Sequence, residues 1–268
     1  TSGQIIFDGR DITKLSKHEM RKLRKDMQLI FQDPYSSLDP RKTVSQIISE
    51  PIRANKILKT QKEIDERVAE LMETVGLAMR LFNTYPHELD GGRRQRIGIA
   101  RALTLNPSLI ILDEPVSALD VSVQSQVLNL LLELQEERKL SYLFIAHDLA
   151  VVKHISDRVA VMYLGKIVEM SDAETIYQSP KHAYTKALLD AIPEPDPARA
   201  NKHQPLPGDV PSPINPPLGS AFGHRIQHPS YPETVGADLT PVEIEPGHWV
   251  APDPCALEPE DWNRIRQR

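Results

Sequence analysis

The chain has 268 residues, 40% of them hydrophobic and 26% charged, which is enough for one sizeable core with appendages. Its formal charge of -5 and pI near 6.0 argue against a nucleic-acid-binding protein, because no long basic stripe offsets the acids. No apolar stretch reaches the roughly 20 residues that a bilayer-spanning helix requires. The single cysteine, Cys255, excludes an intrachain disulfide and a Cys-x-x-Cys metal site.

The spacing of apolar residues predicts alternating strands and helices, and therefore an α/β core. The predicted strands, in chain order, are residues 4–7, 27–31, 109–112, 142–146, 157–163 and 166–170. The predicted helices are residues 17–25, 61–75, 90–103, 122–138 and 182–192. The segment between Pro34 and Pro107 holds two of these helices, so we expect a helical insertion there.

Proline usage changes sharply near Ile192, since 16 of the 23 prolines lie in residues 193–268. Proline-rich segments are extended or irregular and form few strand ladders. We therefore expect residues 193–268 to be a separate appendage that drapes over the main body or a partner. At the other end, a strand and the turn Asp8-Gly9 follow Thr1 directly, and we expect a missing beginning.

The most informative stretch is the apolar run that ends in Asp113-Glu114-Pro115. Residues 109–112 have the pattern of a strand buried on both faces of a parallel sheet, so the acids stand at its carboxyl end. Open α/β sheets bind ligands at that end, and adjacent strand residues point to opposite sides. We predict that Asp113 holds magnesium and Glu114 orients an attacking water. A surface turn that happens to begin with acids is the alternative.

A second group, Leu89-Asp90-Gly91-Gly92-Arg93-Arg94-Gln95-Arg96, stands directly before a predicted helix. Two glycines at a helix start let backbone amides approach a phosphate, and the helix dipole adds roughly half a positive charge there. Taken alone, the octapeptide is better explained by an ordinary helix with Asp90 as its N-cap, because Gly-Gly before a helix is common.

Five elements in this order resemble the ATPase subunit of an ABC transporter: Gln32 after an apolar strand, the stretch from Leu89 to Gln95, Asp113-Glu114, Ser117-Ala-Leu-Asp120, and His147. Two longer phrases, residues 31–41 and 206–217, are similar to oligopeptide/dipeptide importers. The resemblance implies a RecA-like nucleotide-binding core with a helical insertion subdomain and the proline-rich C-terminal appendage. It divides the chain into 1–33 (start of the core, truncated), 34–106 (helical subdomain with the signature motif), 107–192 (remainder of the core) and 193–268 (importer-type extension).

The resemblance also implies a role for each site residue. Glu114 would be the general base, and His147 the switch histidine that contacts the γ-phosphate and fixes the geometry of Glu114. Gln32 would be the Q-loop glutamine, placed with Asp113 at the magnesium ion, and Asp120 would belong to the D-loop. Asp90, Gly91, Gly92 and Arg93 would form the signature motif that contacts nucleotide. The segment 33–41 would lie where a membrane subunit docks. The pair Pro86-His87 matches no family motif, and we expect His87 to be a solvated surface residue.

The implied cofactors are ATP and Mg²⁺. The implied partners are transmembrane permease subunits, a second ATP-binding subunit in a homo- or heterodimer, and indirectly an extracytoplasmic peptide-binding protein, with no nucleic acid. The implied location is peripheral, on the cytoplasmic face of the plasma (inner) membrane.

One departure from the family pattern concerns the phosphate-binding loop. The 268 residues contain no G-x-x-x-x-G-K-S/T motif. The backbone amides, the lysine and the hydroxyl of this loop supply most of the binding of a triphosphate. We therefore expect a fragment or truncated product that does not hydrolyse ATP alone. A nucleotide titration of these 268 residues tests this, and micromolar ATP affinity would contradict it.

A second departure is in the signature, where Asp90 and Arg93 replace the usual serine and glutamine. A carboxylate about 4 Å from a phosphate costs roughly 4 kcal/mol at an effective dielectric near 20. Arg93 and Arg94 are the side chains available to offset it, and we predict that Arg93 neutralises Asp90.

The tail histidines His224, His228 and His248 are widely spaced, so we expect surface histidines there. Relatives of this type carry several tail cysteines that can hold an iron-sulfur cluster, whereas this chain has Ser220 and Cys255, so we expect no metal in the tail. Two functions remain open: an energy-coupling ATPase subunit, or a non-catalytic assembly subunit that keeps the signature and docking surface. A soluble hydrolase outside transport, such as a repair ATPase, is a distant third.

Overall fold

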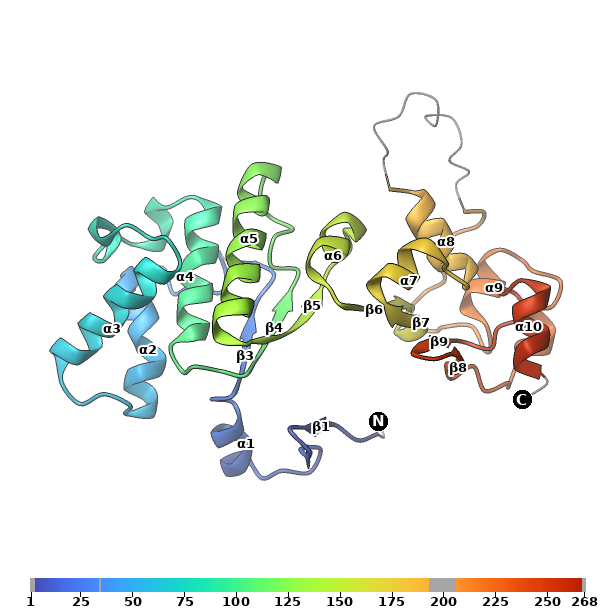
Figure 1. The fold of residues 1–268 in the computed structure, drawn as a ribbon, viewed down its shortest axis with the longest axis horizontal. Coiled ribbons are helices and arrows are strands. Elements are labelled where there is room, and N and C mark those ends of the chain that lie inside the picture. The colour runs from blue at the N-terminus through green and yellow to red at the C-terminus, as the bar shows by residue number, and fades with distance from the viewer. Residues whose placement is uncertain (1–2, 34, 193–205, 267–268) are drawn as a thin grey trace. The chain divides into compact units, whose positions relative to one another are not determined.

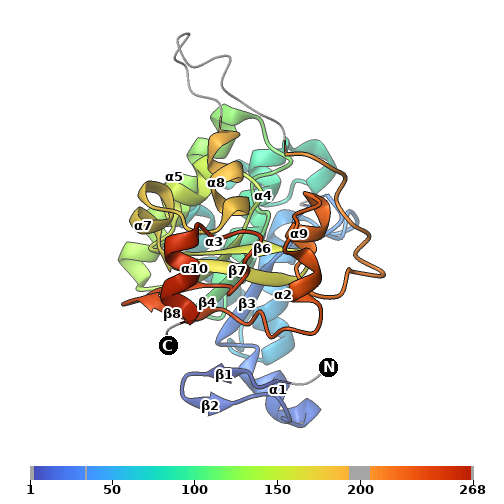
Figure 2. The same ribbon diagram turned by 90° about the vertical axis from the view of Figure 1, so that its right-hand side faces the viewer.

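The computed structural model describes residues 3–33, 35–192 and 206–266, and Figures 1 and 2 show the ribbon in two views. Pro34 and the start of the predicted tail, 193–205, lie outside the described residues. The chain divides into two compact units, Thr1–His147 and Asp148–Arg268. The predicted boundaries after residues 33, 106 and 192 stay predictions.

The first unit contains a short hairpin, a parallel sheet and a group of helices. Its strands are β1 Ile6–Phe7, β2 Arg10–Asp11, β3 Met27–Ile30, β4 Leu109–Asp113 and β5 Ser141–Ile145. Its α-helices are α1 Lys17–Leu23, α2 Val44–Asn55, α3 Gln61–Thr74, α4 Gly91–Leu103 and α5 Val121–Arg138, with short 3-10 turns at Met79–Leu81 and Pro86–Glu88. The predicted elements are present, and α2 is an additional helix.

Local sequence explains where these helices start. Reciprocal capping boxes open α1, α2 and α3, because a Ser or Thr side chain accepts from the third helical amide while Glu or Gln at that position bonds back. Asp90 and Asp120 cap α4 and α5 in the same way with a carboxylate oxygen. The α2, α3 and α4 helices pack on one another, and α4 also packs against α5 and β3.

The sheet of the first unit has the order β3-β4-β5, and both pairings are parallel. Side chains in register alternate between its faces. Ile30 and Leu112 are buried on one face, whereas Leu29 and Leu143 on the other face are 40% and 53% exposed. On β4 itself Ile110 and Leu112 are buried, whereas Leu109 and Ile111 are half-buried, so the predicted burial is met on one face of the strand and only in part on the other.

The second unit is built on an antiparallel sheet with the order β6-β7-β9-β8. Its elements are α6 Leu149–Ile155, β6 Arg158–Tyr163, β7 Lys166–Asp172, α7 Ala173–Gln178, α8 Ala183–Asp190, α9 Ala221–Arg225, a 3-10 turn at Tyr231–Thr234, β8 Val242–Glu245, β9 His248–Val250 and α10 Pro259–Arg266. The tail was expected to be irregular, yet β9 pairs with β7 and extends the sheet.

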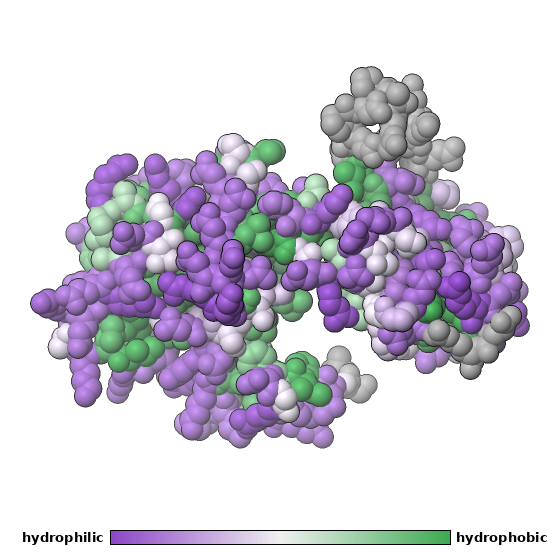
Figure 3. Space-filling view, viewed as in Figure 1, coloured by the Kyte–Doolittle hydropathy of each residue, from purple (hydrophilic) through white to green (hydrophobic). Residues whose placement is uncertain are grey.

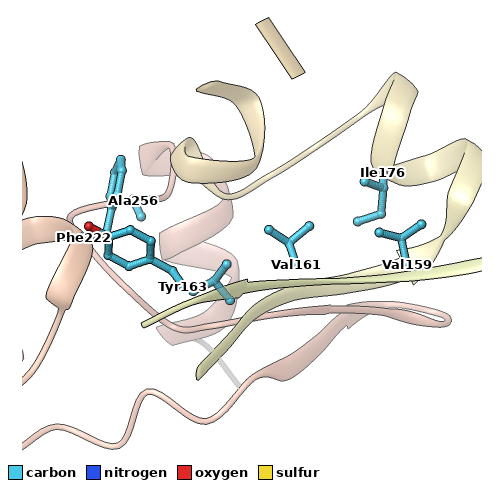
Figure 4. Close-up of a cluster of buried hydrophobic side chains, with 7 residues drawn as sticks. Val159, Val161, Tyr163, Ile176, Phe222 and Ala256 are labelled. Atoms are coloured by element: carbon cyan, nitrogen blue, oxygen red, sulfur yellow. The ribbon is translucent and has the colours of Figure 1, made fainter. Parts of the chain in front are cut away.

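The core of this unit forms where β6 packs against α7, which lies before residue 193, and α9, which lies in the tail. Figure 4 shows Val159, Val161 and Tyr163 on β6, facing Ile176 of α7 at one end of the cluster and Phe222 of α9 at the other. Phe222 and Tyr163 meet edge to face, with ring centroids 6.0 Å apart. The tail therefore supplies side chains to this core.

No helix in the described residues is long and apolar enough to cross a membrane. Hydrophilic side chains cover most of the face drawn in Figure 3, with hydrophobic ones in smaller patches among them.

Candidate functional site

Glu114 stands where the chain turns sharply away from β4. Its backbone φ is +44°, a left-handed conformation that residues other than glycine seldom adopt, and its N–H donates to the Ile145 carbonyl at 2.9 Å. Such a conformation costs on the order of 1 kcal/mol, and residues held this way cluster at functional sites. The strand ends at Asp113. The sequence predicted that both acids belong to the strand and point to opposite sides of it. This is corrected here, because Glu114 lies in the turn after the strand.

Three of the predicted residues meet at the carboxyl ends of the parallel strands. One oxygen of Glu114, Oε2, accepts from Gln32 Nε2 at 2.8 Å and lies 3.3 Å from His147 Nδ1. Gln32 follows β3 and His147 follows β5, so the strands on both sides of β4 supply the contacts. The Glu114 side chain is 25% exposed and that of His147 is 70% exposed. The site is therefore open to solvent, with the carboxylate partly covered.

This arrangement suits a general base. Gln32 donates to Oε2 and His147 lies beside it, while Oε1 takes part in no hydrogen bond or ion pair among the described residues. A carboxylate oxygen held in place but without a partner can accept a proton from a bound water.

Asp113 is half-buried at the end of β4, and its carboxylate forms no hydrogen bond or ion pair with the residues that the structure describes. Carboxylate and side-chain amide oxygens are ligands that Mg²⁺ prefers, and the amide oxygen of Gln32 is available because Nε2 makes the contact to Glu114. Within the described ranges no group of three or more His, Cys, Asp and Glu side chains could hold a metal. Phosphate oxygens and water would have to complete the coordination, as is usual for Mg²⁺.

The second predicted group lies at the start of α4. Asp90 Oδ1 accepts from the Arg93 N–H at 2.8 Å, and Oδ2 lies 3.0 Å from Arg93 Nη1. Both side chains are about half exposed. The ion pair that the sequence suggested is therefore present. Arg94, the other cation considered, points elsewhere: it is buried and donates to the carbonyls of Pro86 and His87.

The two glycines of this group have a structural role in the packing of α4 on the first turn of α5 and on the residues just before it. A Cβ added to Gly91 would lie 3.0 Å from Leu119 Cδ2, and one added to Gly92 would overlap Val123 Cγ1. The sequence suggested that glycine keeps this space free for a phosphate, whereas here side chains of the same chain occupy it. Approach of a phosphate to the backbone amides stays a prediction.

Residues 117–120 lie between the two groups. Ser117 donates to the Glu114 carbonyl from its N–H at 3.2 Å and from its hydroxyl at 3.0 Å. Asp120 caps α5, accepting from the Val123 N–H at 3.1 Å and the Ser122 hydroxyl at 3.0 Å. With Leu119 against Gly91, this segment connects the acidic residue to the start of α4.

The expectation of surface histidines is met at His87 and His224, which are exposed, and only in part at His228, which is half-buried. His248, expected on the surface, is buried instead, and its Nε2 lies 2.8 Å from the carboxylate of Glu169, which is also buried. The reason is that β9 enters the sheet beside β7, which brings the two side chains together. Alternation along β7 gave no signal of a buried acid.

Two arginines of α4 have a role that the sequence did not predict: Arg94, expected near Asp90, contacts Tyr35, and Arg101 donates to Ser37, so both hold the segment after Gln32. Their seven-residue spacing within an otherwise buried helix was the available signal, because seven residues are nearly two turns.

Two family models match the chain. Residues 1–117 match the ABC transporter family, and residues 168–228 match the oligopeptide/dipeptide transporter C-terminal region.

Named relatives agree with both models. A probable peptide ABC transporter ATP-binding protein of Sinorhizobium fredii is 52% identical over 246 residues, covering 92% of this chain and 67% of the relative. An oligopeptide transport ATP-binding protein of Bacillus subtilis is 52% identical over 256 residues, covering 94% and 77%.

Solved structures agree as well. A subunit of a Clostridium perfringens ABC transporter complex superposes with a TM-score of 0.60 at 30% identity, covering 67% of this chain and 69% of that chain. A dimeric ATP-binding cassette with ADP and phosphate, in a post-hydrolysis state, gives 0.57 at 28% identity, covering 65% and 74%.

Proposed function

The chain belongs to the ATP-binding subunits of ABC peptide importers, and we propose that Glu114 is the residue through which it drives ATP hydrolysis for import. The observation that supports this proposal is that Gln32 and His147 both contact one carboxylate oxygen of Glu114, Oε2. In this proposal Glu114 orients the attacking water and takes its proton, while His147 and Gln32 hold the carboxylate in place.

ATP with Mg²⁺ is the proposed cofactor pair. Asp113 and the amide oxygen of Gln32 would hold the metal, which would supply charge stabilisation at the phosphates. Asp90 to Arg93 would face the nucleotide of a second ATP-binding subunit. One of the matched structures is a dimer with ADP and phosphate bound, which supports pairing of two such subunits.

The proposed setting is the cytoplasmic face of the inner membrane, next to transmembrane permease subunits, with an extracytoplasmic peptide-binding protein delivering the cargo. The names of the relatives, which specify peptide or oligopeptide transport, support peptides as the cargo class.

The test is ATP turnover by the transporter assembled with the subunits that co-purify with this chain. Glu114→Gln keeps the shape of the side chain and an acceptor for Gln32 but removes the base. We expect turnover to fall about 10²- to 10⁴-fold with ATP binding retained. Glu137→Gln, which neutralises an exposed acid on α5, is the matched control and should turn over normally.

The same experiment separates the alternative function. If the chain is a non-catalytic assembly subunit, all turnover comes from its partner, and Glu114→Gln leaves the rate unchanged. The absence of a G-x-x-x-x-G-K-S/T motif from these 268 residues is the observation that keeps this alternative open.

A further inference from the structure

The segment after Gln32 is attached to α4 by two arginines. Arg94 Cζ lies 3.6 Å from the centre of the Tyr35 ring, a stacked cation–π contact. Tyr35 is 63% exposed, whereas Arg94 is 6% exposed. The guanidinium of Arg94 is also held by the protein, since its Nε donates to the Pro86 carbonyl at 2.6 Å. The Tyr35 ring therefore stacks on a buried guanidinium that belongs to α4.

The second attachment lies further along the same helix. Arg101 Nη1 donates to the Ser37 carbonyl at 2.8 Å, and this contact is partly buried. Leu38, the next residue, is 2% exposed and anchors the segment in the protein interior. Arg94 and Arg101 are seven residues apart, nearly two turns, so they share one face of α4 about 10 Å apart along its axis.

Because residues 35–38 contact α4 at two points on one face, we expect the segment and the helix to move together. The start of α4, Asp90 to Arg93, lies within about one turn of Arg94. A displacement of residues 35–38 therefore reaches this start through the helix itself. The other connection from this region runs from Gln32 to Glu114 and does not involve α4.

We propose that Arg94 and Arg101 are positioning residues that fasten residues 35–38 to α4, so that a membrane subunit pressing on this segment moves the Asp90–Arg93 group directly. The proposal rests on the proposed function, because it presumes that this segment meets a membrane subunit. It adds a second route to the one through Gln32.

The fastening is tested first on the full 268-residue chain by amide hydrogen exchange of residues 35–38. Arg101→Met removes the donor to Ser37, and Tyr35→Leu removes the ring over Arg94. We expect at least fivefold faster exchange in both, and Arg101→Lys, which can still donate, should recover at least half of the protection. Unchanged exchange in Arg101→Met would overturn the fastening.

Arg96→Met is the matched control. Arg96 is also on α4 and also donates to a carbonyl, that of Val75 at 2.6 Å, but on the side facing α3. Its loss should leave exchange at residues 35–38 unchanged. If Arg96→Met speeds that exchange as much as Arg101→Met does, the effect is general loosening and the specific fastening is overturned.

Transmission is tested in the assembled transporter. The readout is the ratio of ATP turnover with and without the extracytoplasmic binding protein supplied with a casein hydrolysate as mixed-peptide probe. Arg101→Met should lower this ratio at least threefold, Arg101→Lys should restore it, and Arg96→Met should keep it. An unchanged ratio in Arg101→Met would overturn the transmission. Absence of turnover by the unaltered assembly would instead overturn the proposed function, while the exchange result still decides the fastening.

Discussion

At the scale of single residues, the charge of Asp90 is paired within its own helix. Asp90 uses one oxygen to cap α4 and the other to meet Arg93, so its negative charge is partly offset before any ligand arrives. Because both side chains are about half exposed, water screens the pair and its net contribution to stability is small. Its value lies in the charge presented at the helix start.

This charge balance predicts the behaviour of Arg93 variants. Arg93→Gln leaves an unpaired carboxylate beside the proposed nucleotide position, and repulsion should raise the KM for ATP about tenfold in the assembled transporter. Asp90→Ser combined with Arg93→Gln removes both charges and should return the KM to near its starting value. Steady-state ATPase assays over a range of ATP concentrations measure this, and an unaltered KM in Arg93→Gln would refute the pairing role.

At the scale of elements, the contact between α4 and α5 depends on Gly92. A methyl group there would overlap Val123 Cγ1, so Gly92→Ala should destabilise the first unit by about 1–3 kcal/mol. Gly98, on the same helix, has no neighbouring atom within 4 Å of an added Cβ, and Gly98→Ala should stabilise by about 0.5–1 kcal/mol. Urea unfolding followed by circular dichroism measures both. Adding Val123→Ala to Gly92→Ala should recover part of the loss, and no recovery would mean that Val123 is not the obstacle.

Elements with strong periodicity could be predicted from the sequence because a buried stripe leaves a regular spacing. The helices α3, α4 and α5 and the strands β3 to β7 lie within a few residues of their predicted positions. The helix α2 was not predicted, because it contains Pro51, a residue that normally interrupts a helix. The strand β9 was missed because its partner, β7, is more than 70 residues away, and β8, which pairs with β9, lies in the same proline-rich segment that was expected to be irregular.

The site, too, could be predicted only in part. The order of the motifs predicted that Gln32, Glu114 and His147 lie close together, since all three follow parallel strands that end at one edge of the sheet. Backbone geometry at Glu114 could not be predicted, because a left-handed glutamate depends on the N–H bond to Ile145 in a neighbouring strand. Similarly, the burial of Arg94 depends on Tyr35 and on carbonyls of a turn that precedes the helix.

At the scale of the whole molecule, the second unit contains buried ionisable groups that make it sensitive to acid. Burial lowers the pKa of His182 from 6.5 to about 4, with the charges of Asp253 and Glu169 opposing that effect. Burial alone would raise the pKa of Glu169, but hydrogen bonds, from His248 and from the amides of Lys181 and His182, outweigh it and lower this pKa. The neutral histidine and the charged carboxylate are therefore the forms that the fold prefers.

Both shifts have the same consequence for stability. Between pH 6.5 and about 4 the unfolded chain protonates His182 while the folded chain does not, so the unfolded state binds more protons and stability falls as pH falls. Glu169 adds to this loss below pH 4.5, its ordinary pKa, as pH drops through its lowered folded value. The His182 contribution is on the order of 3 kcal/mol.

The prediction is tested by tryptophan fluorescence, because both tryptophans of the chain, Trp249 and Trp262, lie in the second unit. Urea midpoints should fall steadily from pH 7 to pH 4. His182→Asn removes the titrating ring but keeps an acceptor for the Tyr184 amide, which the ring now caps at 3.1 Å, so this variant should flatten the slope between pH 6.5 and 4. His224→Asn, at an exposed position of the same unit, should keep the original slope. If His182→Asn unfolds with the same pH dependence as the unaltered chain, His182 is not the origin of the acid sensitivity. The variant Glu169→Gln would then show whether the buried carboxylate of Glu169 causes it.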